Sequence, residues 1–236
     1  MITDFHSHIL PGVDDGSQSL DQSLKMLAME AEQGIRRVVA TPHFYPRYDA
    51  PERFREKRNR AEALLRQAMP QLPGCPEIEI GAEVYYFRGI SESDVLPELT
   101  IRGSRSIMIE LPLPPWEGEI WQELADIWDQ WGIIPIVAHI DRYIAPFRTH
   151  GIPRRLAEMP VMVQANASFF LNRQTAALAM KLLKNDQIQL LGSDCHDTAQ
   201  RAPNLAQAMD AIRAKLGEEP LERIIHYERN ILGDLP

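Results

Sequence analysis

The chain has 236 residues, of which 44% are hydrophobic and 25% are charged, a composition typical of a folded globular protein and not of a disordered or fibrous one. The formal net charge of −8 argues against a nucleic-acid-binding face, because a phosphate backbone is bound by clustered Lys and Arg. With no signal-peptide pattern, no apolar run near the roughly 20 residues of a membrane span and only two cysteines, we expect one cytoplasmic domain, residues 1–236, with no membrane span.

Short runs rich in apolar and β-branched residues predict strands along the whole chain. Most of these runs are too uniformly apolar to have one face in water, which is typical of a buried parallel sheet. The seven predicted strands are residues 2–6, 36–40, 77–82, 106–110, 133–138, 161–165 and 189–192.

Segments with helical periodicity lie between the predicted strands. The first helix has Ser17 or Ser19 as its N-cap and ends at Gly34. The remaining predicted helices are residues 51–69, about 119–132, 175–185, 202–216 and 221–232. This alternation predicts an α/β fold, with a seven-stranded βα barrel favoured over a doubly wound open sheet.

Each predicted strand is followed by a side chain that can bind a metal ion. In a barrel, the carboxyl ends of all strands meet at one mouth, so these side chains would lie together. Five of the seven histidines belong to this set, which chance placement explains poorly. The set is His6, His8, His43, Glu83, Glu110, His139, Asn166, Asp194 and His196.

Spacing and burial favour metal binding by this set. The period of two along an extended chain places His6 and His8 on one side, and does the same for Asp194 and His196. Glu83 and Glu110 each end an apolar run, where an unpaired carboxylate is costly. A cation explains both carboxylates, and the alternative is an ion pair with Arg102 or Arg105. The donors outnumber the positions around one ion, which predicts a site for several.

Eight motifs, taken in order, resemble the PHP (polymerase and histidinol phosphatase) superfamily. Within it, they are most similar to the metal-dependent protein-tyrosine phosphatases of bacterial capsular and exopolysaccharide operons. The motifs are DFHSH (4–8), DDG (14–16), TPH (41–43), GAE (81–83), IEL (109–111), AHIDR (138–142), QANAS (164–168) and GSDCH (192–196). The resemblance implies a distorted, TIM-like (β/α)7 barrel with three divalent ions, manganese first and iron, cobalt or zinc as alternatives.

The resemblance also implies how the ligands divide among the three ions. Many relatives have a second His after the TPH motif, where this chain has Phe44. Asp14 is the alternative to Asp15 as a ligand. The implied sets are His6, His8, Glu83 and Asp194 for the first ion, Glu83, Glu110 and His139 for the second, and Asp15, His43 and His196 for the third.

The implied reaction is hydrolysis of phosphotyrosine by a metal-bridging hydroxide. Arg142 and Arg201 follow ligand motifs and would hold the phosphoryl oxygens, with surface salt bridges as the alternative. The implied substrate is the C-terminal tail of a bacterial tyrosine kinase that regulates polysaccharide synthesis and export. A small metabolite such as histidinol phosphate, or a phosphodiester, is the alternative. Asp141, His150 and Asp197 are candidates for a general acid.

Two further features bear on the chemistry. Residues 195–201 match the Cys-x5-Arg loop of cysteine-dependent phosphatases, but they contain no glycine, and the neighbouring Asp194 and Asp197 would raise the pKa of the thiol. Residues 44–48 and 113–116 offer aromatic surface for a phosphotyrosine ring or peptide, with ordinary packing as the alternative.

Overall fold

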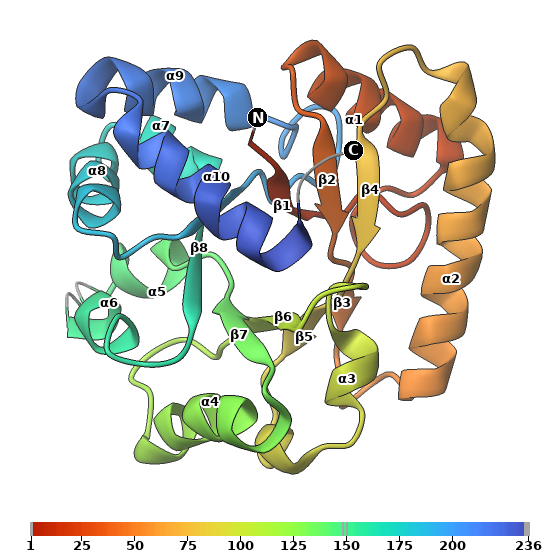
Figure 1. Ribbon diagram of the computed structural model, residues 1–236. Helices are drawn as coiled ribbons and strands as arrows, with labels where there is room; N and C mark the ends of the chain where they lie inside the picture. Colours follow the sequence, from red (N-terminus) through yellow and green to blue (C-terminus); the bar gives the residue numbers. More distant parts are fainter. Residues whose placement is uncertain (1, 148, 150, 234–236) are drawn as a thin grey trace.

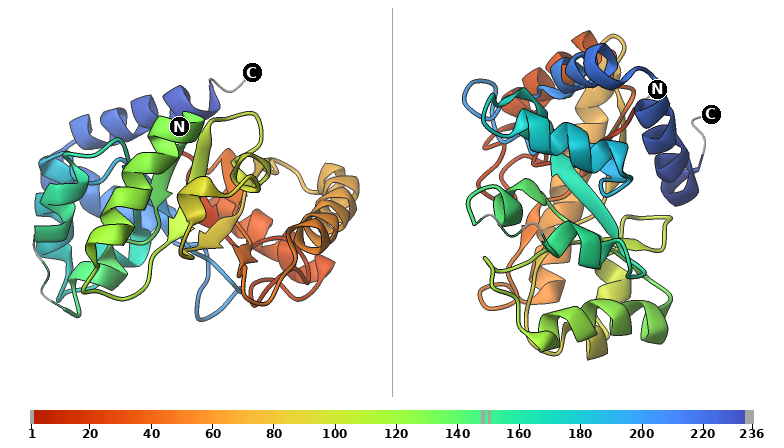
Figure 2. Two further views of the ribbon diagram at one scale, coloured as in Figure 1. Left: turned by 90° about the horizontal axis from the view of Figure 1, so that it is seen from below. Right: turned by 90° about the vertical axis from the view of Figure 1, so that its left-hand side faces the viewer.

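The structure, a computed structural model, describes residues 2–147, 149 and 151–233. Short strands lie at the centre of the molecule, and helices surround them (Figure 1). The other two views show the helices on the outside of the strands as well (Figure 2). His150, one of the candidates for a general acid, lies outside the described residues.

The strands form two sheets in which every neighbouring pair is parallel, as expected. The smaller sheet has the order β1 (Asp4–Ser7), β2 (Arg37–Ala40) and β4 (Glu77–Ile80). The larger sheet has the order β3 (His43–Phe44), β5 (Glu83–Tyr85), β6 (Ser106–Glu110), β7 (Ile134–Val137), β8 (Met162–Asn166) and β9 (Leu190–Gly192).

The strand count differs from the expected seven, since the described residues form nine short strands. The strand predicted at residues 36–40 ends at Ala40 as expected, and the one predicted at 77–82 stops at Ile80. After each of them, the chain re-enters a sheet, at His43 and at Glu83. Pro42 has no N–H and cannot donate to a ladder, which is one reason for the interruption. Backbone hydrogen bonds from Gly81 to Ala40 (2.9 Å) and from Glu83 to Pro42 (3.0 Å) keep the two segments side by side across the gap. His43 and Glu83 are therefore register partners on β3 and β5.

Six of the helices correspond to the predicted ones within a few residues: α1 (Leu20–Glu32), α2 (Pro51–Ala68), α4 (Gly118–Trp131), α8 (Ala176–Lys184), α9 (Leu205–Leu216) and α10 (Glu219–Leu232). Ser19, and not Ser17, is the N-cap of α1, because its hydroxyl oxygen accepts the Gln22 N–H. Four short helices were not predicted: α3 (Leu96–Leu99), α5 (Asp141–Ile144), α6 (Gly151–Leu156) and α7 (Ala167–Leu171). In the described part of the chain, no helix combines the length and the apolar character needed to cross a bilayer.

One apolar cluster shows that the sheets curl. It joins Phe5, Val39, Met108, Ile136 and Leu190, which come from five different strands and are fully buried. Five strands can share one cluster only if they bend around it. A second, larger cluster packs the helices against the strands. The carboxyl ends of the strands consequently face one common region, which is where the predicted ligands lie.

Candidate metal centre

Two histidines of the first strand segment meet two carboxylates. The Nε2 atoms of His6 and His8 are 3.2 Å apart, and both rings are buried. They lie 3.3 and 3.4 Å from Glu83 Oε2, and 3.6 and 3.5 Å from Asp194 Oδ1. Of the four side chains expected around the first ion, each histidine thus lies within 3.6 Å of both carboxylates.

Glu83 lies at the centre of the cluster and is fully buried. Its Oε1 is 2.7 Å from His139 Nε2, and its Oε2 is 2.9 Å from His43 Nδ1. Glu110 lies near the same two histidines. Its Oε1 is 3.7 Å from His139 Nε2, and its Oε2 is 3.8 Å from His43 Nδ1. The strand pairing explains this arrangement, because the register of β3 and β5 places His43 opposite Glu83.

The third group lies nearer the surface. Asp15 Oδ1 is 3.6 Å from His43 Nε2 and 3.5 Å from His196 Nε2, and 68% of its side chain is exposed. A ligand atom of His8 lies within the same small volume. Asp14 has another role, since its Oδ2 accepts hydrogen bonds from the His8 ring (2.7 Å) and from the His43 N–H (2.9 Å). Asp14 therefore orients two of the histidines.

The charges of the cluster are strongly coupled. Burial disfavours ionisation of Glu83 and Asp194, but the surrounding imidazoles hold the pKa of both carboxyls well below its usual range. Burial and the Glu83 charge raise the pKa of Glu110. Burial and the neighbouring His8 lower the pKa of His196 to about 4, so its ring is neutral near pH 7 and available as a ligand.

Unpaired atoms show that the cluster suits cations. Glu110 Oε2 and His196 Nε2 are buried and form no hydrogen bond with any described residue, and Glu83 Oε2, although 2.9 Å from His43 Nδ1, lacks hydrogen-bond geometry to it. Buried polar groups normally have partners, and a divalent ion would provide one for carboxylate and imidazole groups alike. The donor set therefore fits the metal ions expected from the sequence.

Gln164 was missed as a site residue by sequence reasoning. Its Oε1 lies 3.2 Å from His6 Nδ1 and accepts the His139 N–H at 2.7 Å, and its Nε2 donates to Asn166 Oδ1. A buried Gln within an apolar strand was the available signal. The backbone of His139 (φ 32°) and of Asp194 (φ 54°) is left-handed, which is rare for residues other than glycine and concentrates at functional sites.

Both arginines expected to bind phosphate reach the edge of the cluster. Arg142 donates to Asp194 Oδ2 at 2.8 Å, and Arg201 lies 2.8 Å from Asp194 Oδ1. Their side chains are 38% and 39% exposed, so each guanidinium touches the buried cluster and also faces solvent. Asp197 accepts the backbone N–H of Arg201, and its backbone hydrogen bonds lower its pKa. An ionised Asp197 cannot act as an acid, but it holds the loop that carries Arg201.

Two alternatives raised by the sequence have little support in the structure. Arg102 pairs with Glu62 at 2.7 Å, and among the described residues neither Arg102 nor Arg105 lies within ion-pair distance of Glu83 or Glu110. The Cys195 thiol is completely buried, and burial raises its pKa well above the usual value, as does the Asp4 carboxylate. A thiol in this state is a poor nucleophile.

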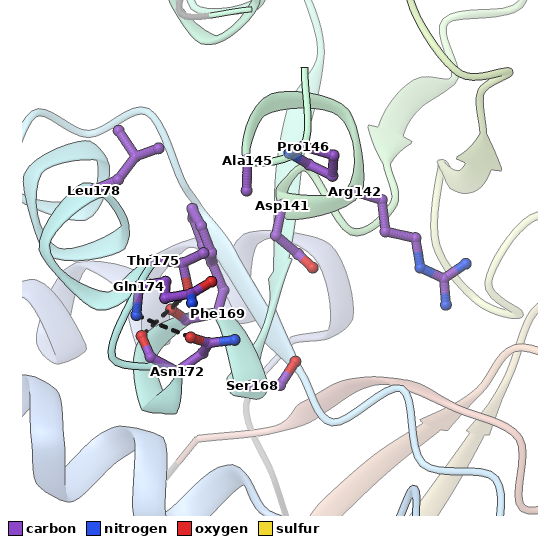
Figure 3. Close-up of a pocket in the computed structure, with 10 residues that line it drawn as sticks. All are labelled: Asp141, Arg142, Ala145, Pro146, Ser168, Phe169, Asn172, Gln174, Thr175 and Leu178. Carbon is purple, nitrogen blue, oxygen red and sulfur yellow. Dashed lines mark hydrogen bonds between the residues drawn. The ribbon is translucent and has the colours of Figure 1, made fainter. Parts of the chain in front are cut away.

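Two pockets that share lining residues open beside Arg142. Arg142, Asp194 and Arg201 border a polar pocket of about 260 Å³. Asp141, Arg142 and Ser168 line this pocket and also a larger one of about 790 Å³ among α5, α7 and α8. In Figure 3, the Arg142 side chain extends away from the group formed by Phe169, Asn172 and Thr175, with Asp141 and Ser168 between them. Burial raises the pKa of Asp141, and its Oδ1 accepts the Asn166 N–H.

The predicted aromatic rim is only partly at the surface. Phe44 is buried against Phe54, with ring centroids 5.0 Å apart, and Trp116 packs against Trp121 and Tyr143 in the core. For these two residues, ordinary packing is the correct interpretation. Tyr48 and Leu113, in contrast, are 71% and 63% exposed.

The comparisons with known proteins agree with this architecture. A family model for capsular polysaccharide synthesis, CpsB/CapC, matches residues 2–232. The tyrosine-protein phosphatase CpsB of Streptococcus pneumoniae is 31% identical, with 98% of each chain covered. The tyrosine-protein phosphatase YwqE of Bacillus subtilis (strain 168) is 27% identical, over 92% of this chain and 85% of that protein.

Two solved structures have a similar fold. A structure of the metal-dependent tyrosine phosphatases YwqE from Bacillus subtilis and CpsB from Streptococcus pneumoniae has a TM-score of 0.84 at 23% identity, covering 99% of this chain and 96% of that chain. A phosphotriesterase homology protein from Escherichia coli, with phosphate in its active site, has a TM-score of 0.54 at 13% identity, covering 94% of each chain.

Proposed function

The chain belongs to the CpsB/CapC family of capsular polysaccharide synthesis proteins, and on that premise we propose that it is a metal-dependent protein-tyrosine phosphatase. The membership confirms the resemblance noted in the sequence. The observation that carries the proposal is the convergence of nine histidine and carboxylate side chains on one mouth, next to two arginines. This arrangement supports hydrolysis of a phosphate monoester without a protein nucleophile.

The proposed ligands are those expected from the sequence. His6, His8, Glu83 and Asp194 would hold one ion, Glu83, Glu110 and His139 a second, and Asp15, His43 and His196 a third. Buried atoms of Glu83, Glu110 and His196 that lack a well-formed hydrogen bond support this assignment. Divalent ions, manganese first and iron, cobalt or zinc as alternatives, would lower the pKa of water and offset the phosphoryl charge.

The chain's own groups would bind and orient the substrate. Arg142 and Arg201 are the proposed catalytic residues, because a guanidinium binds phosphoryl oxygens bidentately and both lie 2.8 Å from Asp194 at the edge of the cluster. Asp14 would orient His8 and His43, and Gln164 would orient His6 and the His139 backbone.

The proposal includes a closed, seven-stranded barrel in one domain. β3 continues β2, and β5 continues β4. When each of these pairs is counted as one strand, the nine short strands become seven. A parallel bridge between Ser7 and Cys195 and a hydrogen bond from His8 to Cys195 (2.9 Å) join β1 to the segment after β9. These contacts support a distorted (β/α)7 barrel whose mouth holds the cluster.

The proposed substrate is phosphotyrosine in the C-terminal tail of a bacterial tyrosine kinase that regulates polysaccharide synthesis and export. The cytoplasm is the proposed location, because such a tail would meet the enzyme there. A small metabolite such as histidinol phosphate is the alternative, since the cluster recognises the phosphate and not its leaving group.

The test compares hydrolysis of a phosphotyrosine peptide with that of histidinol phosphate by the manganese-loaded protein. We expect kcat/KM to favour the peptide by at least about 100-fold, or about 2.7 kcal/mol of transition-state stabilisation. The same peptide with phosphoserine serves as the matched control. Hydrolysis of histidinol phosphate alone would overturn the proposed substrate while keeping the metal centre.

A further inference from the structure

We propose that Tyr45 and Tyr85 form an aromatic wall at the mouth of the cluster, against which the ring of an aryl phosphate stacks. In this way the two tyrosines would select aryl over alkyl phosphate esters. The inference rests on the proposed phosphatase function and adds the residues that determine its specificity.

The strand register places the two tyrosines together. β3 and β5 are parallel, with His43 opposite Glu83 and Phe44 opposite Val84. Tyr45 and Tyr85 each come two residues after one of the proposed ligands, so the period of two returns them to the side of the sheet that carries those ligands. Their ring centroids are 5.7 Å apart. The Tyr45 ring also stacks on the His43 ring, at 5.0 Å and an interplanar angle of 27°.

The exposure of neighbouring residues shows that this wall faces outward. Phe44 and Val84, which lie between each ligand and its tyrosine, are buried in the core on the other side of the sheet. Tyr45 is half-buried and Tyr85 is 36% exposed. A large apolar ring with an accessible face beside buried carboxylates and histidines is suited to an aromatic ligand.

The position of the arginines supports the same orientation. Arg142 and Arg201 border a polar pocket with Asp194, which suits the phosphoryl oxygens and not a phenyl ring. Tyr85 is the register partner of Glu110 on β6, and Glu110 Oε1 is 3.4 Å from Arg142 Nη1. In the sheet, β6 lies between β5, which carries Tyr85, and β7, which precedes Arg142. Tyr85 and Arg142 therefore flank Glu110, and a phosphate held by Arg142 would lie one strand away from the aromatic wall.

The larger pocket is the rival location for the ring. It contains Leu178 and Phe169 (Figure 3), but Phe169 is 2% exposed, so it offers little surface for stacking. Three of the residues that line this pocket, Ser168, Asn172 and Gln174, are exposed and polar. Leu178 provides a variant that separates the two locations.

The test measures inhibition by phenylphosphonate and by methylphosphonate, which share the anion and differ in the ring. In Tyr45→Leu and in Tyr85→Leu, we expect the Ki of phenylphosphonate to rise about threefold to tenfold, as for the loss of one aromatic contact, while the Ki of methylphosphonate is unchanged. For a phosphotyrosine peptide, KM should rise more than kcat falls. Tyr45→Phe keeps the ring and should behave as the wild-type protein.

Two controls show whether the loss of a wall tyrosine itself weakens binding. Tyr48→Leu is the matched control, because Tyr48 is on the same loop and is 71% exposed. The metal content of each variant shows whether the loss of Tyr45 disturbs His43, and Tyr85→Leu tests the wall without that contact.

Three results would overturn the inference: equal weakening of both phosphonates, no change in either tyrosine variant, or weakening of phenylphosphonate only in Leu178→Ala. Failure of the phosphatase proposal can be distinguished from failure of this inference. In that case, the metal-loaded wild-type protein would leave the phosphotyrosine peptide intact. Phenylphosphonate binding, followed by calorimetry, would still report on the wall.

Discussion

Asp194 lies between the proposed metal ligands and the arginines that are proposed to bind phosphate. Its carboxylate lies near the rings of His6 and His8, which are proposed ligands, and it also contacts Arg142 and Arg201, which are proposed to bind phosphate. Its position depends on a left-handed backbone conformation. By this proposal, a single residue would link metal binding to substrate binding, and its removal should affect both.

We predict that Asp194→Asn lowers kcat/KM at least about 100-fold and reduces the bound metal, because the amide carries no charge and is a weaker ligand. Elemental analysis and phosphotyrosine kinetics measure the two effects. Asp186→Asn is the matched control, since Asp186 is also left-handed (φ 56°) but lies apart from the cluster, where it accepts the Tyr227 hydroxyl. Full activity with a full metal complement in Asp194→Asn would contradict the ligand assignment.

Glu228 should make the free energy of unfolding depend on pH. It is buried, its Oε2 accepts the Thr3 N–H at 2.9 Å, and burial raises its pKa to about 8. The folded state favours the protonated carboxyl, whereas the unfolded chain ionises near the ordinary pKa of 4.5. The wild-type protein therefore loses stability as the pH rises from about 4.5 to about 8, by at most about 1.4 kcal/mol for each pH unit.

Glu228→Gln stays neutral and should gain stability relative to the wild-type protein across that range. Urea unfolding with chelator present, at about pH 5 and about pH 8, measures the difference. Glu62→Gln is a control of opposite sign, because its salt-bridging partners lower the pKa of Glu62 and the substitution should destabilise the protein at the higher pH. A Glu228→Gln difference that is the same at both pH values would contradict the proposed burial effect.

At the scale of elements, the site depends on how closely β9 approaches β1. Gly192 ends β9, and a Cβ atom placed on it would come within 2.5 Å of His6 Cβ and 2.8 Å of the His6 backbone nitrogen. Such contacts force the backbone to move. Only glycine at position 192 leaves room for His6 at the place where its ring lies next to Glu83.

We therefore predict that Gly192→Ala destabilises the protein by about 1–3 kcal/mol and weakens metal binding. Gly118→Ala is the matched control, because a Cβ there meets no atom within 4 Å and the position begins α4. Thermal unfolding and metal titration of both variants measure the effects. A Gly192→Ala protein with wild-type stability and metal affinity would show that the close approach is dispensable.

The sequence predicted the long, regular elements better than the short ones. The strand at residues 106–110 was predicted with its observed bounds, because residues 107–109 form an apolar, partly β-branched run. The breaks after β2 and β4 were missed because β3 and β5 are only two and three residues long. Helices α5 and α7 span four and five residues, too few to show a helical period.

Residue types and spacing predicted which side chains converge, but not the role of each one in the cluster. The period of two correctly brought His6 and His8 together. The sequence pattern cannot distinguish the adjacent Asp14 and Asp15, because the local backbone conformation decides which of the two side chains points into the cluster. Gln164 was missed because its hydrogen bonds reach His6 on β1 and His139 beyond the end of β7, which are distant in sequence.

At the scale of the whole molecule, the cluster assembles only when strands from nearly the whole chain come together. Its members come from segments between His6 and His196, so almost the whole chain must fold before the carboxylates and imidazoles meet. Metal ions that bind this assembled cluster would also stabilise the fold, because they bind the native state in preference to the unfolded one.

The most direct test of the proposed metal centre is phosphotyrosine hydrolysis before chelation, after chelation and after return of manganese, in the wild-type protein and in Cys195→Ser. We predict that chelation abolishes turnover, that manganese restores it, and that both proteins respond alike. Turnover that survives chelation in the wild-type protein and disappears in Cys195→Ser would contradict this prediction, and would assign the reaction to the thiol instead of the metal centre.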